Sequence, residues 1–387
     1  MVLLHMHNVT VAMDARMLGK GGTGVSTYAR SLRSVLPLLS TRPTILEDGG
    51  SAATPFARGR RLAAALSPRP RAARLLPQSP GGSGLFVPDV FRLSQVYFNV
   101  HRRLLPITVP GQPGIMHWTY PVPIQLVGWK NLYTVHDVIP LTDPSLSEID
   151  PVRHRRLLDR IVEAAAALVT VSSTAAAAIR TTLGCLPSFV VDCSQPIDVP
   201  DRTVGPPPAG LEPGYLLVCG SVEPRKNIAR LLAAWRQSGT ALPLVIAGPD
   251  GWRSAEFKRD IEATAGVIRL GYVSRDDLLS LIGHARALLM PSLAEGFGLP
   301  VAEAMALGTP VLTSSGSALE EIAGGAALLV DPYNIEAMAS AIGRLATDDA
   351  LCAELAARGR LQALRFTRQA FAARLSTLYA GLIAQPG

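Results

Sequence analysis

The stretch Pro291-Ser-Leu-Ala-Glu295-Gly-Phe-Gly298-Leu-Pro300-Val-Ala-Glu303-Ala-Met305 decides the fold of this chain. An apolar run ends near Pro291, a loop with two glycines follows, and Pro300 suits the first turn of a helix. The unpaired N–H groups of such a helix point back at the strand end, where doubly wound sheets bind phosphate and polyhydroxyl ligands. We therefore expect Glu295, in the loop, and Glu303, one turn into the helix, to face one crevice.

Two carboxylates at this place favour a sugar-binding site. Each ionised carboxylate accepts hydrogen bonds from sugar or ribose hydroxyls. Gly296 and Gly298 would let a ligand approach the backbone closely. Glu303 alone could also be an acid that merely stabilises the start of its helix. The occurrence of both acids within this one loop-and-helix segment favours the binding role.

The rest of the second half alternates between short apolar runs and amphipathic stretches. Ser274 with Asp277, and Asn334, provide helix caps. This alternation predicts a parallel doubly wound domain. The predicted strands are 215–219, 244–247, 267–270, 287–290, 311–313 and 327–330, and the predicted helices are 227–237, 255–265, 275–284, 300–307 and 335–345.

The first half begins in the same way. A strand at 9–13 leads into the glycine loop Gly19-Lys20-Gly21-Gly22-Thr23-Gly24 and then into a helix from about Val25. Further strands are predicted at 131–135 and 167–171, whereas residues 48–113 read as loops and short helices. The proline-rich, aperiodic segment 196–214 separates the halves. We expect an N-terminal domain over 1–196 and a C-terminal domain over 197–368.

A second chemical segment is Gly220-Ser221-Val-Glu223-Pro-Arg225-Lys226-Asn227, which follows a predicted strand and opens a helix. Two adjacent cations at a helix N-terminus form a clamp for a diphosphate. A solvated Arg-Lys pair is the alternative interpretation. The sequence places no DxD-like acidic pair nearby to hold a metal, so we expect no metal site and no cofactor, with protein cations alone neutralising the diphosphate.

Two further segments carry weaker signals. In Tyr133-Thr-Val-His136-Asp137 the histidine follows a predicted strand and would project toward the interdomain cleft, although a single histidine is usually structural. The glycine loop after the first strand lacks the GxGxxG spacing of dinucleotide-binding folds, so its support for a phosphate site is weak.

In order and spacing, these segments resemble the retaining glycosyltransferases of family 4, the group 1, mannosyltransferase-like enzymes. The resemblance spans almost the whole chain and fades over residues 48–113. It implies an α/β fold of the GT-B type, with two facing Rossmann-like domains and a cleft between them. It also implies that the last helix, about 369–387, crosses back onto the N-terminal domain.

The resemblance assigns roles to individual residues. Lys226, helped by Arg225, would bind the donor diphosphate, and Glu303 the ribose. One departure is Ser221, where many relatives have an arginine, so that Arg225 becomes the substitute. His136 would lie against the sugar near the reacting carbon. The remaining donor contacts implied are Glu295 and Gly296 with the amides of Phe297, Gly298 and Leu299 at the sugar or its phosphates, Gly22 and Gly24 at the diphosphate, and Tyr272 and Val273 at the base.

The resemblance further implies sugar transfer with retention of configuration and without a metal. GDP-mannose is the leading expectation for the donor, and UDP- or dTDP-sugars are alternatives. The acceptor would be a glycan or a polyprenyl-diphosphate-linked glycan in bacterial surface polysaccharide synthesis. A protein or a small molecule is the alternative acceptor.

The charge is unevenly spread along the chain. Residues 1–195 carry 20 Lys+Arg against 11 Asp+Glu, or +9, whereas residues 196–387 carry 17 against 19, or −2. Residues 56–75 (Phe56 to Leu75) hold six arginines and no acid. Such a stretch suits an anionic leaflet or a lipid diphosphate. A merely solubilising surface is the alternative.

The remaining composition points to a cytoplasmic protein, peripheral at the inner face of the membrane. The four cysteines have neither CxxC spacing nor paired histidines, so neither disulfides nor a zinc site is predicted. The first residues lack the pattern of a signal peptide. The longest uncharged run, 104–129, contains five prolines and does not predict a spanning helix.

Two other classes of protein compete with a transferase. A nicotinamide-dependent oxidoreductase should show GxGxxG and an acid about 20 residues further on. A non-enzymatic module that binds nucleic acid or an anionic surface would explain the arginine-rich stretch. It would leave Lys226, Glu295 and Glu303 unexplained, and we expect no nucleic-acid partner.

Overall fold

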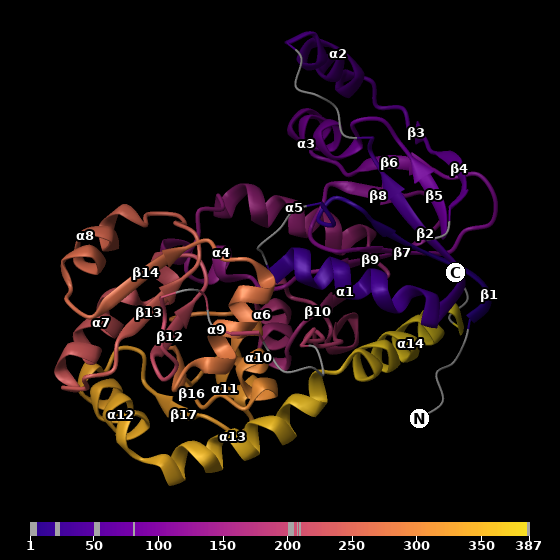
Figure 1. Cartoon of the computed structure of the whole chain (residues 1–387). Coiled ribbons are helices and arrows are strands. Elements are labelled where there is room, and N and C mark those ends of the chain that lie inside the picture. The colour runs from indigo at the N-terminus through magenta and orange to yellow at the C-terminus, as the bar shows by residue number, and fades with distance from the viewer. Residues whose placement is uncertain are drawn as a thin grey trace.

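The computed structural model describes residues 6–19, 24–49, 55–79, 82–199, 205–206, 208 and 210–384. Two α/β units are each built around their own sheet (Figure 1), so the predicted pair of Rossmann-like domains is confirmed as a fold. The first unit contains the chain up to β11, and the second contains the strands from β12 onward.

The N-terminal sheet has eight strands in the order β11-β10-β9-β7-β1-β2-β5-β4. Every neighbouring pair is parallel except β4 with β5. Its centre is wholly buried at Val11, Ala12 and Met13, because a strand covered by helices on both faces is apolar throughout. The strands are β1 Met6–Asp14, β2 Ser40–Glu47, β4 Arg74–Ser79, β5 Gly82–Phe86, β7 Ile115–Trp118, β9 Lys130–Thr134, β10 Ala167–Thr170 and β11 Val190–Asp192.

The region 48–113 is more ordered than loops and short helices. It contains two helices of 12 residues each, the strands β4 and β5 at the edge of the main sheet, and two strands of a small sheet, β3-β6-β8. Edge strands lie partly in solvent and need few apolar residues, so their sequence carries little periodicity. The further elements are β3 Arg71–Ala72, β6 Leu105–Thr108, β8 Ile124–Leu126, α1 Gly24–Leu39, α2 Pro55–Leu66, α3 Val90–His101, α4 Ile139–Thr142, α5 Pro151–Ala164 and α6 Ser173–Leu183.

The C-terminal sheet has six parallel strands in the order β14-β13-β12-β15-β16-β17. All six predicted strands are present within two residues of the expected ends, and Ser274 and Asn334 accept hydrogen bonds from the amides of Asp277 and Ala337 as predicted. The helix α11 Ala318–Ala323 was not predicted. The other elements are β12 Leu216–Cys219, β13 Leu244–Ala247, β14 Val267–Gly271, β15 Ala287–Met290, β16 Val311–Ser314, β17 Leu328–Val330, α7 Ile228–Gln237, α8 Ala255–Ala263, α9 Arg275–His284, α10 Leu299–Leu307 and α12 Ile335–Thr347.

Two helices close the chain, α13 Asp349–Ala363 and α14 Arg368–Ala384. α13 packs on α10 of the second unit, whereas α14 lies along α1 of the first (Figure 1). The hydroxyl of Tyr379 on α14 lies 2.6 Å from Nδ1 of the buried His117. The last helix therefore joins the core of the N-terminal half.

Candidate active site

The two units meet at the loop that follows β15. A Cβ atom added to Gly296 would stand only 2.4 Å from the carbonyl oxygen of His136, so only glycine fits this approach. The hydroxyl of Ser172, after β10, donates a 2.7 Å hydrogen bond to the carbonyl of Gly296. The carboxyl ends of N-terminal strands thus face the glycine loop of the C-terminal unit, which is where doubly wound sheets bind ligands.

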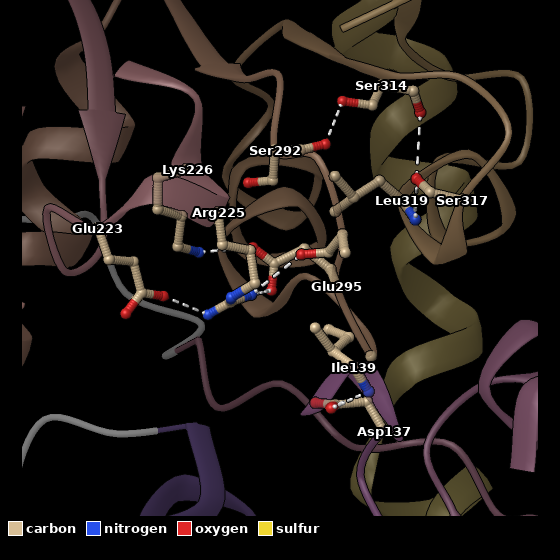
Figure 2. Close-up of polar contacts among 12 residues, drawn as sticks. Asp137, Ile139, Glu223, Arg225, Lys226, Ser292, Glu295, Ser314, Ser317 and Leu319 are labelled. Carbon is tan, nitrogen blue, oxygen red and sulfur yellow. Dashed lines mark hydrogen bonds and ion pairs between the residues drawn. The ribbon is translucent and has the colours of Figure 1, made fainter. Parts of the chain in front are cut away.

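The two predicted clamp cations converge on one carboxylate (Figure 2). Nζ of Lys226 donates to Oε1 of Glu295 at 2.6 Å, and Nη1 of Arg225 donates to Oε2 of the same residue. Nη2 of Arg225 also donates to Glu223 at 2.6 Å. Both cations belong to the 3₁₀ turn Pro224–Lys226 directly after β12. Since Lys226 has three N–H donors, it can bind Glu295 and an anion together.

The turn that carries the cations is fixed to the glycine loop by its next residue. Asn227 has a φ of 59°, a left-handed conformation that asparagine tolerates. Its side-chain amide donates to the carbonyls of Pro291 at 3.1 Å and Pro332 at 2.7 Å. The turn with Arg225 and Lys226 is therefore tied to the glycine loop 291–299, which we call the donor loop after its predicted role.

The charges of this cluster are strongly coupled. Burial opposes ionisation of Glu295, but the cations of Arg225 and Lys226 outweigh it and lower the pKa of Glu295 to about 2. Burial likewise disfavours the charge of Arg225, yet Glu295 and Glu223 raise its pKa above the usual value. Glu295 and Arg225 are thus both charged at neutral pH.

The donor loop is shaped by its glycine and its aromatic residue. Gly298 has a φ of 101°, and a Cβ there would lie 2.4 Å from Cδ2 of Leu319. Phe297 is buried and packs edge-on against Phe366, with ring centroids 5.4 Å apart. These contacts orient the amides of residues 297–299 at the start of α10. Leu299 lies 3.8 Å from the Cβ position of Gly24, whereas Gly22 is outside the described residues.

Glu303 is buried in α10, where its Oε1 atom lies 2.7 Å from Nη2 of Arg275 on α9. Its side chain is 1% exposed, so this ion pair supplies its nearest compensating charge. Sequence reasoning did not identify Arg275. The only available signal was its place directly after the helix-capping Ser274.

Tyr272 and Val273, which were both expected to contact the base of the nucleotide, have different surroundings in the structure. Tyr272 is 64% exposed and lines a cavity of about 400 Å³ with Pro249, Asp250 and Arg269. Val273 packs instead against the hydrophobic core. Ser221 lies against Gly251, so its side chain turns toward the same loop that borders the cavity.

His136 lies under the donor loop with one nitrogen already engaged. Its Nε2 atom lies 3.0 Å from the carbonyl of Thr119 and must carry the proton there, because a carbonyl only accepts. The Tyr28 ring packs edge-on against the imidazole at 5.0 Å. Burial lowers the pKa of His136, although the Thr119 bond and Asp137 act in the opposite direction. The imidazole is therefore neutral at neutral pH, and Nδ1 remains for a ligand.

A contact between the halves was missed by the sequence reasoning. The Glu321 carboxylate on α11 accepts from the amides of Ser173 and Thr174, both at 2.7 Å. It therefore caps α6 of the other unit. No sequence pattern indicated this contact, because Glu321 stands in a helix that was not predicted.

No group of three or more His, Cys, Asp or Glu side chains among the described residues is placed to hold a metal ion. None of the helices described is long and apolar enough to cross a membrane.

The two facing α/β units have the GT-B fold, and comparison with known proteins shows which families the chain resembles. Residues 206–362 match the family model described as glycosyl transferases group 1. The chain thus contains a stretch that matches group 1 glycosyl transferases over residues 206–362, and mannosyltransferases are among the proteins that it resembles.

Among its relatives is O-antigen chain mannosyltransferase B of Escherichia coli, 39% identical over 40% of this chain and 42% of that protein. O-antigen chain mannosyltransferase RfbU of Salmonella typhimurium is 32% identical over 54% of this chain and 59% of that protein. The chain thus spans less than two thirds of the length of these curated relatives. The structure of sucrose-phosphate synthase from Thermosynechococcus elongatus superposes with a TM-score of 0.71 at 21% identity, covering 97% and 99% of the two chains.

Proposed function

We propose that this protein transfers a sugar, with retention of configuration and without a metal, from a nucleotide diphosphate to a glycan or a lipid-linked glycan. The observation that carries the proposal is the Lys226–Glu295–Arg225 cluster at the start of the donor loop. Free N–H donors on Lys226 and the amides of residues 297–299 stabilise charge that develops on the departing diphosphate. Each such charge-assisted contact contributes about 2–4 kcal/mol.

The remaining donor contacts follow from the same geometry. Glu303 accepts hydrogen bonds from the ribose hydroxyls, and its ion pair with Arg275 holds the carboxylate in place. The base lies in the cavity beside Tyr272. Nδ1 of His136 faces the sugar, because its Nε2 proton is held by Thr119.

GDP-mannose is the proposed donor, and bacterial surface polysaccharide synthesis is the proposed setting. The support is the naming of two relatives as O-antigen chain mannosyltransferases. A UDP- or dTDP-sugar would use the same clamp, because the cations contact only the diphosphate.

A thermal-shift screen tests this donor assignment. Wild type, Lys226→Ala and the control Lys130→Ala are compared with GDP-, UDP- and dTDP-sugars, with magnesium and with EDTA. Lys130 is a matched control because it stands at the amino end of β9, away from the cleft. A donor-specific rise that survives EDTA and disappears only in Lys226→Ala supports the proposal. An equal rise in all three proteins contradicts it.

We further propose a peripheral membrane contact through α2 and the strands after it. Leu62, Leu66 and Leu75 are exposed by 51%, 60% and 60%, which is unusual for leucine. Four of the six arginines at 56–75 also face solvent. Arg61 pairs with Asp89, and Arg71 donates to the carbonyl of Ala64. The outward arginines are Arg58, Arg60, Arg69 and Arg74.

Liposome flotation tests the membrane contact. Wild type should float with vesicles that contain anionic lipid, and a Leu62→Ser/Leu66→Ser variant should float several-fold less. Binding that is equal with and without anionic lipid would remove the membrane part of the proposal.

A further inference from the structure

Three neighbouring strands of the N-terminal sheet end side by side next to the donor loop. β9, β7 and β1 are adjacent and parallel, so the residues that follow them lie along one edge. His136 follows β9, Thr119 and Tyr120 follow β7, and Arg16 follows β1 after Asp14. With strands ~4.8 Å apart, the end of β1 lies roughly 10 Å along this edge from that of β9.

Arg16 holds its charge between two aromatic rings. Its guanidinium carbon lies 5.6 Å from the centre of the Phe91 ring and 6.0 Å from that of Tyr120. Within the described ranges the guanidinium makes no hydrogen bond and no ion pair with a carboxylate. Cation–π contacts position the group but leave its N–H donors unused. A half-buried arginine that keeps all its donors free is placed to bind a ligand.

Buried polar atoms without a hydrogen-bond partner among the described residues lie near Arg16. Asp14 is fully buried, and its Oδ2 atom accepts from the amide of Thr119 at 2.7 Å. Asp14 Oδ1, Thr119 Oγ1 and the Tyr120 hydroxyl are buried, and none has a hydrogen-bond partner among the residues described. Native proteins satisfy nearly all such atoms. Three of them at neighbouring strand ends indicate polar groups of a bound molecule or ordered water.

We propose that Arg16 and Tyr120 form the acceptor subsite, and that Arg16 binds an anionic group, phosphate or carboxylate, carried by the acceptor sugar. This inference rests on the proposed function, because the proposed function assigns the opposite side of the cleft to the donor. The planar guanidinium donates two parallel hydrogen bonds to such an anion. The Tyr120 hydroxyl binds a sugar hydroxyl, and the buried Asp14 holds the backbone of Thr119 behind it. The subsite lies two strands from His136, which is within reach of an acceptor whose hydroxyl attacks beside that residue.

Calorimetric titration of the full chain tests the subsite. GDP is held at saturation so that the diphosphate clamp is filled, and the probes are mannose 1-phosphate, glucuronate and the neutral methyl α-mannoside. Arg16→Gln is compared with wild type and with Arg33→Gln, which removes the same charge from an exposed position on α1. Tyr120→Phe keeps the ring under Arg16 and removes only the hydroxyl. Melting temperatures of all variants establish that they are folded.

We expect wild type and Arg33→Gln to bind at least one anionic sugar ten-fold or more tightly than the neutral methyl α-mannoside. Arg16→Gln should lose at least ten-fold of this affinity, and Tyr120→Phe about three-fold. Which anionic probe binds distinguishes phosphate from carboxylate. Equal binding by Arg16→Gln, or no anion binding by GDP-loaded wild type, overturns the subsite. Failure of wild type to bind any nucleotide would overturn the proposed function instead. In that case the same titrations without GDP still compare wild type with Arg16→Gln for binding of the anionic sugars, and equal binding overturns the subsite.

Discussion

Replacing Glu295 with glutamine removes the carboxylate that both clamp cations share while keeping the shape of the side chain. Glu295 is 9% exposed on its side chain, and Lys226 is 11% exposed, so solvent screens the pair little. The pKa of Glu295 is lowered from 4.5 to about 2, which corresponds to about 3 kcal/mol of stability at pH 7. The variant should lose about this much, because two buried cations are left with less compensating charge.

The loss should depend on pH in one direction. The pKa of Glu295 is lower in the folded than in the unfolded chain, so its contribution is complete above about pH 4.5 and declines as pH falls toward about 2. Calorimetry at pH 7 should show a melting temperature roughly 6–12 °C below wild type for the transition of the C-terminal unit. The control Glu256→Gln breaks an exposed pair with Arg253 and should change the free energy by less than about 1 kcal/mol. An unchanged melting temperature in Glu295→Gln would refute this account of the clamp.

Three further changes test other parts of the cleft. Gly296→Ala would drive a methyl group into the His136 carbonyl and separate the halves. Nucleotide binding, measured by titration, should therefore persist, while donor turnover, measured by kinetics, falls about 100-fold. Burial lowers the pKa of His117 to about 3, so urea melts should lose about 1.4 kcal/mol per pH unit as pH falls below about 6.5, and His117→Asn should flatten that slope. Glu321→Gln weakens the cap on α6 and should cost about 1 kcal/mol by calorimetry, whereas the surface change Glu336→Gln should leave the melting temperature unaltered.

The four inner strands of the C-terminal sheet were predictable because they are buried on both faces. Such strands are continuous apolar runs between glycine or proline, as at Leu244–Ala247, and their ends can be located within a residue or two. The edge strand β4 and its neighbour β5 carry an arginine, a proline, serines and glycines, so the same criterion failed there. Tertiary pairing, which no local pattern encodes, makes them strands.

Part of the candidate site could likewise be predicted from the sequence, and part of it could not. Lys226 and Glu295 could be placed near each other because each follows a strand of the same sheet at its carboxyl edge. The approach of Gly296 to His136 joins two separate domains, and nothing local to either segment encodes it. The Arg275 partner of Glu303 likewise arises from packing of α9 on α10.

The most direct test of the central claim is turnover of GDP-mannose by wild type, Lys226→Ala and Lys130→Ala in EDTA, with a bacterial lipid extract as the source of acceptor. The account predicts GDP release together with mannosylated lipid for wild type and Lys130→Ala, and at least a 100-fold slower reaction for Lys226→Ala, as expected when a principal charge-stabilising contact is lost. Equal turnover by Lys226→Ala, or a reaction that stops in EDTA, would contradict it.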